Sequence, residues 1–139
     1  MRISYQSSDV CSVIVTFQTN INEFTGILKK HRDNFKQIII VNNTPQINLS
    51  QFKSKQVSII NNPDNVGLSA ALNIGIMEAK KQGAKMVALF DQDTLLPDDF
   101  TQNMLKYIKA YPFKKKPALF SPVYFNHVTD DYGSIINFK

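Results

Sequence analysis

Two acidic residues separated by one position, Asp91 and Asp93 in the segment DQD, are the strongest candidates for chemistry in this 139-residue sequence. Two carboxylates this close repel each other unless a cation lies between them. Hard cations such as Mg²⁺ bind a few carboxylates and complete their coordination with water and phosphate oxygens. The pair therefore predicts a metal site that receives a nucleotide diphosphate. The alternative is structural: Asp93 or Asp98 caps a following helix, and Asp91 ends a strand in solvent.

The sequence around this pair alternates between apolar runs and helical patterns. Five apolar runs rich in β-branched residues are typical of strands buried on both faces. They cover residues 10–17, 37–41, 57–60, 86–90 and 118–125. The segment DQD directly follows the fourth run. Strands that alternate with helices predict an α/β fold with a mostly parallel sheet, right-handed crossovers and helices on both faces.

Apolar residues at helical spacing predict three helices between these runs. Asn20 is placed to cap the first helix. The second covers residues 68–82 and stops at Gly83, and Pro97 lies in the first turn of the third. Gly75, in the middle of the second helix, costs about 1 kcal/mol relative to alanine. We therefore expect Gly75 to pack closely against the sheet.

Polar and aromatic residues follow the predicted strands at the edge where parallel sheets bind ligands. Phe17 is a candidate for stacking on a base, and Asn42 offers an amide that can pair with a pyrimidine edge. Asn65 and Gly67 precede the second helix, whose first N–H groups attract anions. Each also has a structural alternative, because phenylalanine ends many strands and asparagine is common in turns. Their occurrence at successive strand ends favours a nucleotide site.

The composition excludes several classes of protein. Hydrophobic residues make up 43% of the chain and charged residues 19%, which are globular values, and 139 residues predict a single domain, residues 1–139. The single cysteine, Cys11, excludes an internal disulfide, and no Cys/His cluster has the spacing of a zinc site. Because the sequence shows no secretory signal and no apolar run of about 18–20 residues, we expect a cytoplasmic protein.

The net charge of +5 suits an anionic partner. Basic clusters at residues 29–32, 80–81 and 114–116 fall at the ends of predicted helices. Because cations there complement the helix dipole, we interpret these clusters first as solvated helix ends. The sequence contains no recognised nucleic-acid module. The charge alone does not choose among anionic partners. Together with the predicted metal and diphosphate site, it favours a diphosphate donor as first partner and peripheral contact with an acidic membrane surface as second, and we expect no nucleic acid.

Four segments resemble the family 2 glycosyltransferases of the GT-A fold, and within them the bacterial rhamnosyltransferases of cell-surface polysaccharide synthesis. The segments are VIVTFQ, IIIVNNT, NNPDNVGLSAALNIGI and ALFDQDTLLP. Together they span roughly residues 11–100. The DQDT segment is the most specific of the four. The resemblance implies a GT-A, Rossmann-like sheet and transfer of a sugar from a nucleotide donor.

The resemblance also implies roles for individual residues in the base pocket. Thr16 and Phe17 would line the pocket of the donor nucleotide, with Phe17 in a stacking position usually held by tyrosine. Asn42 stands where the family commonly has an aspartate that accepts the imide N–H of uracil or thymine. An asparagine carbonyl accepts the same hydrogen bond without the charge.

The remaining matches concern the diphosphate and the metal. Asn65 and Gly67 match a loop beside the nucleotide. Asp91 and Asp93 match the DxD motif, in which the second aspartate is the more direct ligand of Mg²⁺ or Mn²⁺. The donor implied is dTDP-L-rhamnose or a UDP-sugar, and the acceptor is a saccharide or a lipid-linked sugar.

An inverting transferase also needs a general base that takes the proton of the acceptor hydroxyl. In the family this carboxylate lies well downstream of the DxD, so we expect it beyond residue 139 and expect this chain to lack most of the acceptor-binding half. Asp130 and Asp131 predict a polar turn between strands. An alternative is a truncated remnant or accessory module that binds a nucleotide or a partner chain without transferring sugar. Another nucleotide-binding α/β domain is disfavoured because GxGxxG and GxxxxGK[ST] are both absent.

Overall fold

Four parallel strands form the sheet that positions the residues discussed above. They are β1 (Val10–Thr16), β2 (Gln37–Asn42), β3 (Val57–Asn61) and β4 (Met86–Asp91), in the order β3-β2-β1-β4. The computed structural model describes residues 5–112, 118–122, 125–126 and 130–132. The predicted α/β class and the first four predicted strands are confirmed.

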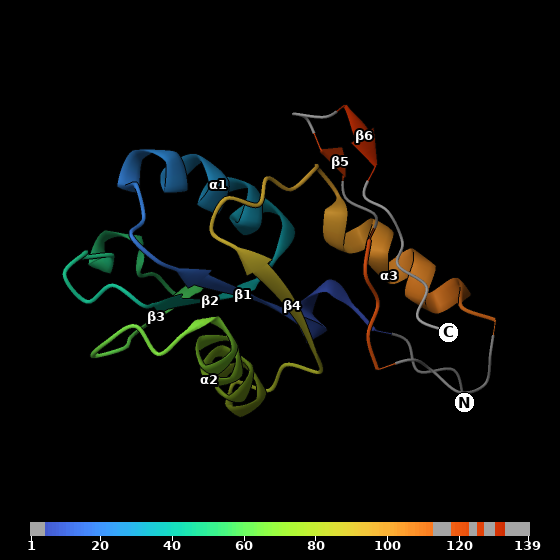
Figure 1. Cartoon of the computed structure of the whole chain (residues 1–139). Coiled ribbons are helices and arrows are strands. Elements are labelled where there is room, and N and C mark those ends of the chain that lie inside the picture. Colours follow the sequence, from blue (N-terminus) through green and yellow to red (C-terminus); the bar gives the residue numbers. More distant parts are fainter. Residues whose placement is uncertain (1–4, 113–117, 123–124, 127–129, 133–139) are drawn as a thin grey trace, which may run out of the picture.

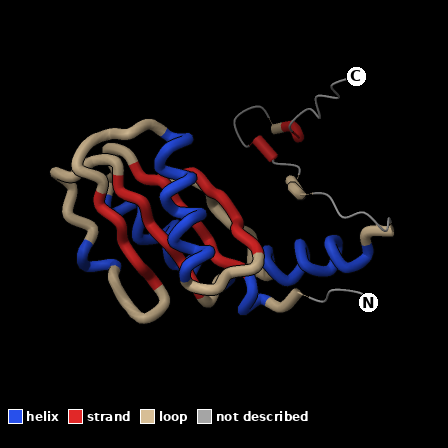
Figure 2. Tube along the Cα trace, turned by 90° about the horizontal axis from the view of Figure 1, so that it is seen from below, coloured by secondary structure: helices blue, strands red, loops and turns tan. Residues whose placement is uncertain are grey.

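Three helices connect and cover these strands. They are α1 (Ile21–Asn34), α2 (Leu68–Lys81) and α3 (Phe100–Ala110), preceded or separated by the short 3-10 helices η1 (Ser7–Asp9) and η2 (Ser50–Phe52). Helix α1 lies on one side of the sheet with α3 beside it, and α2 crosses the strands on the other side (Figures 1 and 2). None of the helices in the described part of the chain is long and apolar enough to cross a membrane.

Alternate residues of β1 point to opposite faces of the sheet and enter two separate cores. Ile14 belongs to the core that includes Phe24 and Leu28 of α1. Val13 belongs to the core that includes Ala71 of α2. Because both faces of β1 are covered, the strand is a continuous apolar run rather than an alternating one.

Gly75 of α2 lies against the sheet, as the sequence predicts. A β-carbon at this position would overlap Cγ1 of Val13 and lie 3.1 Å from Cγ2 of Val41. Both valines are fully buried, and closely packed interiors leave little room for them to move aside. The glycine therefore allows the backbone of α2 to approach β1 and β2.

Helix α3 begins later than the sequence predicts. Pro97 lies in the loop before the helix, and Asp99, the N-cap residue, has a left-handed φ of 59°. Asn34, the last residue of α1, donates from Nδ2 to the Pro97 carbonyl at 3.2 Å and accepts from the Thr101 N–H at 3.2 Å. This tertiary contact sets the start of α3, so the proline signal was wrong by about one helical turn.

The described residues of the run 118–125 add no fifth strand to this sheet, contrary to the prediction. Residues 118–122 contain no strand, and Phe125 belongs to a separate two-stranded sheet. Phe125–Asn126 (β5) pairs antiparallel with Asp131–Tyr132 (β6), and Asp130 adopts a φ of 54° in the turn before β6. An apolar run alone does not distinguish a sheet strand from another apolar segment. The basic cluster at residues 114–116 lies outside the described residues.

Candidate functional site

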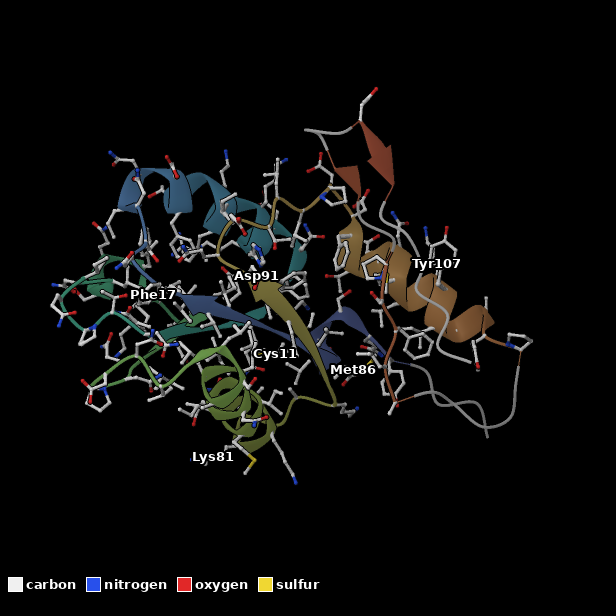
Figure 3. The ribbon with its side chains drawn as sticks, viewed as in Figure 1. Cys11, Phe17, Lys81, Met86, Asp91 and Tyr107 are labelled. Carbon is white, nitrogen blue, oxygen red and sulfur yellow. The ribbon has the colours of Figure 1, made fainter. Side chains whose placement is uncertain are left out.

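A pocket of about 420 Å³ opens at the carboxyl ends of β1, β2 and β4. This is the edge of a parallel α/β sheet where ligands bind. The residues of its wall are Val15, Phe17, Asn43, Asn65, Gly67, Leu68, Asp91, Gln92 and Asp93. The structure thus brings together Phe17, Asn65, Gly67, Asp91 and Asp93 from the predicted site. Figure 3 labels Phe17, just past the end of β1, and Asp91, at the end of β4.

Asp91 and Asp93 present two carboxylates to this pocket. Asp91 is the last residue of β4, and the Thr94 N–H donates to its carbonyl at 3.2 Å, which closes a turn around Asp93. Both aspartates are exposed, and neither carboxylate has a hydrogen bond or ion pair with another described residue. Their negative charges are therefore available to a ligand.

The helix-capping part of the structural alternative is wrong, whereas Asp91 does end β4 and is exposed to solvent. The first turn of α3 is bonded by the Asn34 side chain, which accepts from the Thr101 N–H, and neither Asp93 nor Asp98 caps the helix. Asp98 instead pairs with Lys30 at 2.8 Å. The hydrogen bond from Lys30 lowers the pKa of the Asp98 carboxyl. Of these acidic residues, only Asp91 and Asp93 line the pocket.

The donor set of the pocket fits a hard cation that shares its ligands with a substrate. No group of three His, Cys, Asp or Glu side chains that could hold a metal occurs in the described ranges. Mg²⁺ is commonly held by one or two carboxylates together with water and substrate phosphates. Two free carboxylates without histidine or cysteine therefore suit Mg²⁺ or Mn²⁺ in complex with a diphosphate better than a structural zinc ion.

The start of helix α2 brings a partial positive charge to the wall of the pocket. Gly67 is the N-cap of α2, with a φ of 82° that favours glycine, and no side chain caps the helix. The Asn65 side chain accepts from the Gly67 N–H at 3.0 Å, which holds the loop before the helix. The uncapped N–H groups at the start of a helix of this length attract anions.

Asn43 is a pocket residue to which the sequence alone assigned no role. Its Oδ1 accepts from Nδ2 of Asn62 at 2.7 Å, and its own Nδ2 donates to the Gly67 carbonyl at 3.4 Å. These bonds fasten the loop of residues 61–67 to the end of β2. The available signal was its place beside Asn42 after the same strand.

Thr16 and Asn42 do not line the pocket, in contrast to the expectation of direct contact with the base. Both are buried. The Thr16 hydroxyl donates to Asn42 Oδ1 at 3.4 Å, and the same oxygen accepts from the Thr44 N–H at 3.0 Å. Asn42 Nδ2 donates to the Ile47 carbonyl at 2.9 Å and to Asn61 at 3.1 Å. Because these groups are already paired, the two residues support the floor of the site.

His31 of α1, a buried residue, contacts the loop after Asp93 at the Thr94 carbonyl. Its Nε2 lies 3.4 Å from the Thr94 carbonyl and its Nδ1 lies 3.0 Å from the Ser12 hydroxyl, so the neutral ring donates to the former and accepts from the latter. Burial lowers the pKa of His31 to about 4, although the Thr94 carbonyl opposes this effect. His31 is therefore a neutral core residue and not part of a solvated basic helix end.

Comparison with known proteins agrees with this geometry. Residues 12–116 match the family described as "Glycosyl transferase family 2". The chain is also 24% identical over 135 residues to "dTDP-rhamnosyl transferase RfbF" of Shigella flexneri, and the alignment covers 96% of this chain and 44% of that relative. The chain thus spans less than half the length of this relative. Because the family match extends over most of the chain and includes the carboxyl ends of all four strands of the sheet, the chain belongs to glycosyl transferase family 2.

Proposed function

We propose that the pocket binds a nucleotide-diphospho-sugar together with Mg²⁺ or Mn²⁺, as the donor in a glycosyl transfer of cell-surface polysaccharide synthesis. The observation that carries this proposal is the placement of two unpaired carboxylates, an exposed aromatic ring and an uncapped helix start around one pocket. The 24% identical relative, whose printed name is a dTDP-rhamnosyl transferase, supports dTDP-L-rhamnose as the donor, with a UDP-sugar as the second choice.

The base of the donor would stack on Phe17. The ring is 44% exposed although it follows a fully buried strand, and an exposed aromatic face in a pocket provides a stacking platform for a nucleotide base. The diphosphate would extend from there towards Asp91 and Asp93, with the first turn of α2 facing it. The pocket volume of about 420 Å³ is within the usual range of small-molecule sites.

The aspartates would hold the cation at the diphosphate end of the pocket, with Asp93 as the more direct ligand. When bound, the cation offsets the negative charge that develops on the departing nucleotide diphosphate. The chain itself orients the donor by fixing the base at one end of the pocket and the diphosphate at the other. Such positioning is a large part of what an enzyme contributes to group transfer.

The carboxylates of the pocket bear on the general base of the reaction. The pocket wall contains two carboxylates, Asp91 and Asp93, and both are assigned to the cation. Within the described residues the pocket therefore offers no third carboxylate to act as base in an inverting transfer. This favours, as second candidate, a module that binds the donor without completing the transfer by itself.

Calorimetric titration with dTDP, UDP and GDP, each with and without Mn²⁺, tests the proposal. We expect binding of dTDP or UDP that requires the metal. Asp93→Asn should weaken this binding at least about tenfold, since a charge-assisted contact contributes more than a neutral one. The control Asp98→Asn removes the same charge from a residue that pairs with Lys30 away from the pocket, and it should bind normally. Absence of metal-dependent binding to all three nucleotides would refute the proposal.

Two further assays separate the finer parts of the proposal. Transfer of rhamnose from dTDP-rhamnose to a lipid-linked saccharide by this chain alone would refute the second candidate, a module that only binds the donor. We also propose that the protein acts at the cytoplasmic face of the membrane, where its net charge of +5 favours acidic lipids. Co-sedimentation with phosphatidylglycerol vesicles should then exceed that with phosphatidylcholine vesicles, and equal binding would contradict this placement.

A further inference from the structure

Gln92, the residue between the two aspartates, directs its side chain towards the loop after β1. Its Oε1 accepts from the Phe17 N–H at 2.9 Å and from the Thr19 hydroxyl at 2.6 Å. Its Nε2 donates to the Phe17 carbonyl at 2.9 Å. One side-chain amide therefore pairs with both backbone groups of the residue that carries the exposed aromatic ring.

This pairing continues the sheet beyond the point where its backbone ladder ends. The register of β1 and β4 runs to the pair Val15 and Asp91, where β4 ends. The amide of Gln92 then takes the place of a neighbouring strand and bonds to Phe17 as a backbone would. Phe17 and the DQD turn, which are 75 positions apart in the sequence, are thus fixed to each other.

The loop after β1 needs such a restraint because its conformation is unfavourable by itself. Gln18 has a φ of 48°, a left-handed value that is unfavourable for a residue other than glycine. Its N–H donates to the Thr44 hydroxyl at 2.8 Å on one side, while Gln92 holds Phe17 on the other. A strained segment keeps its shape only when its surroundings fix it from several sides.

We propose, on the basis of the function proposed above, that Gln92 is a positioning residue that holds the Phe17 stacking platform in register with the metal ligands Asp91 and Asp93. The residue type suits this role. The glutamine amide offers an acceptor for the Phe17 N–H and a donor for the Phe17 carbonyl on two separate atoms, whereas ionised glutamate, lysine and methionine of similar length each lack at least one of them. The base and the diphosphate of one nucleotide would thereby be recognised by a single rigid frame.

The test measures the binding of the base and the binding of the diphosphate separately. Dissociation constants for dTDP and for inorganic pyrophosphate, both with Mn²⁺, are measured for the wild type and for Gln92→Met, which keeps the length of the side chain and removes its hydrogen bonds. Since base–aromatic stacking contributes about 1–3 kcal/mol per base, we expect dTDP binding to weaken about tenfold. Pyrophosphate binding should change less than about twofold, because Gln92 makes no bond to either carboxylate.

Gln56→Met is the matched control. Gln56 donates to the carbonyls of Arg32 and Phe35 at 2.8 and 2.6 Å, outside the pocket, so this variant loses comparable backbone bonds. Both dissociation constants should remain at wild-type values. Equal weakening of dTDP and pyrophosphate by Gln92→Met, or no weakening of dTDP, would overturn the positioning role while the proposed function stands.

Two other outcomes are also decisive. If the wild type shows no metal-dependent binding of dTDP, the proposed function fails and the inference fails with it. If circular dichroism shows that Gln92→Met does not fold, Thr19→Val replaces it, because this change removes only the 2.6 Å bond to Gln92. The dTDP constant should then rise about threefold, as expected for one neutral hydrogen bond, with the pyrophosphate constant unchanged, and any other pattern would overturn the inference.

Discussion

Replacement of Gly75 by alanine should destabilise the protein although alanine is the better helix former. The new β-carbon would overlap Cγ1 of Val13 and lie 3.1 Å from Cγ2 of Val41. Overpacking of this kind costs about 1–3 kcal/mol, and the overlap places the cost near the upper end. Alanine regains about 1 kcal/mol of helix propensity. We therefore expect the free energy of unfolding to fall by about 2 kcal/mol.

Gly26 provides a matched control for this prediction. It also lies inside a helix, α1, but a β-carbon built there meets nothing within 4 Å. Gly26→Ala should therefore stabilise the protein by up to about 1 kcal/mol. Urea unfolding followed by far-ultraviolet circular dichroism suits this chain, which contains no tryptophan. If Gly75→Ala is as stable as the wild type, the close approach of α2 to the sheet is refuted. If both variants lose stability, the open space around Gly26 of α1 is refuted.

Three further predictions concern buried polar groups. As the pH falls from 6.5 to 4, the free energy of unfolding should decrease by about 3 kcal/mol through His31, because the unfolded ring takes up a proton that the buried ring resists. A His31→Gln variant should lack this component. Equal slopes of unfolding free energy against pH for the variant and the wild type would contradict the prediction. Asn43→Ala leaves Nδ2 of Asn62 without its buried partner and should lower the free energy of unfolding by about 1–3 kcal/mol in the same urea assay; an unchanged midpoint would show that the asparagine contacts do not hold the loop. Burial raises the pKa of the Cys11 thiol to about 12. Labelling of this thiol by iodoacetamide, followed by mass spectrometry, should therefore be slow in buffer and fast in urea. Rapid labelling of the native protein would disprove the burial of β1.

The positions of the main elements follow from local signals in the sequence. Continuous apolar runs predicted β1 to β4, because strands buried on both faces leave no polar alternation. Asn20 predicted the start of α1, and its side chain accepts from the N–H groups of Asn22 and Glu23. Gly75 predicted a close helix-to-sheet contact. Because strand ends meet at one edge of a parallel sheet, Phe17, Asp91 and Asp93 were also predicted as neighbours.

What the sequence by itself determined is therefore the fold class, the edge of the sheet where the pocket lies and most of the residues that line it. Only the tertiary structure decided which neighbouring side chain faces the pocket. Asn42 and Asn43 are adjacent and chemically identical. The side chain of Asn42 forms hydrogen bonds beneath the pocket and does not line it, whereas Asn43 is part of the pocket wall. Likewise, the bonds from Gln92 to Phe17 join residues 75 positions apart, and no local pattern encodes a partner at that separation. The physical reason is that burial and hydrogen-bond pairing are properties of the assembled fold, whereas strand and helix signals depend on nearby residues.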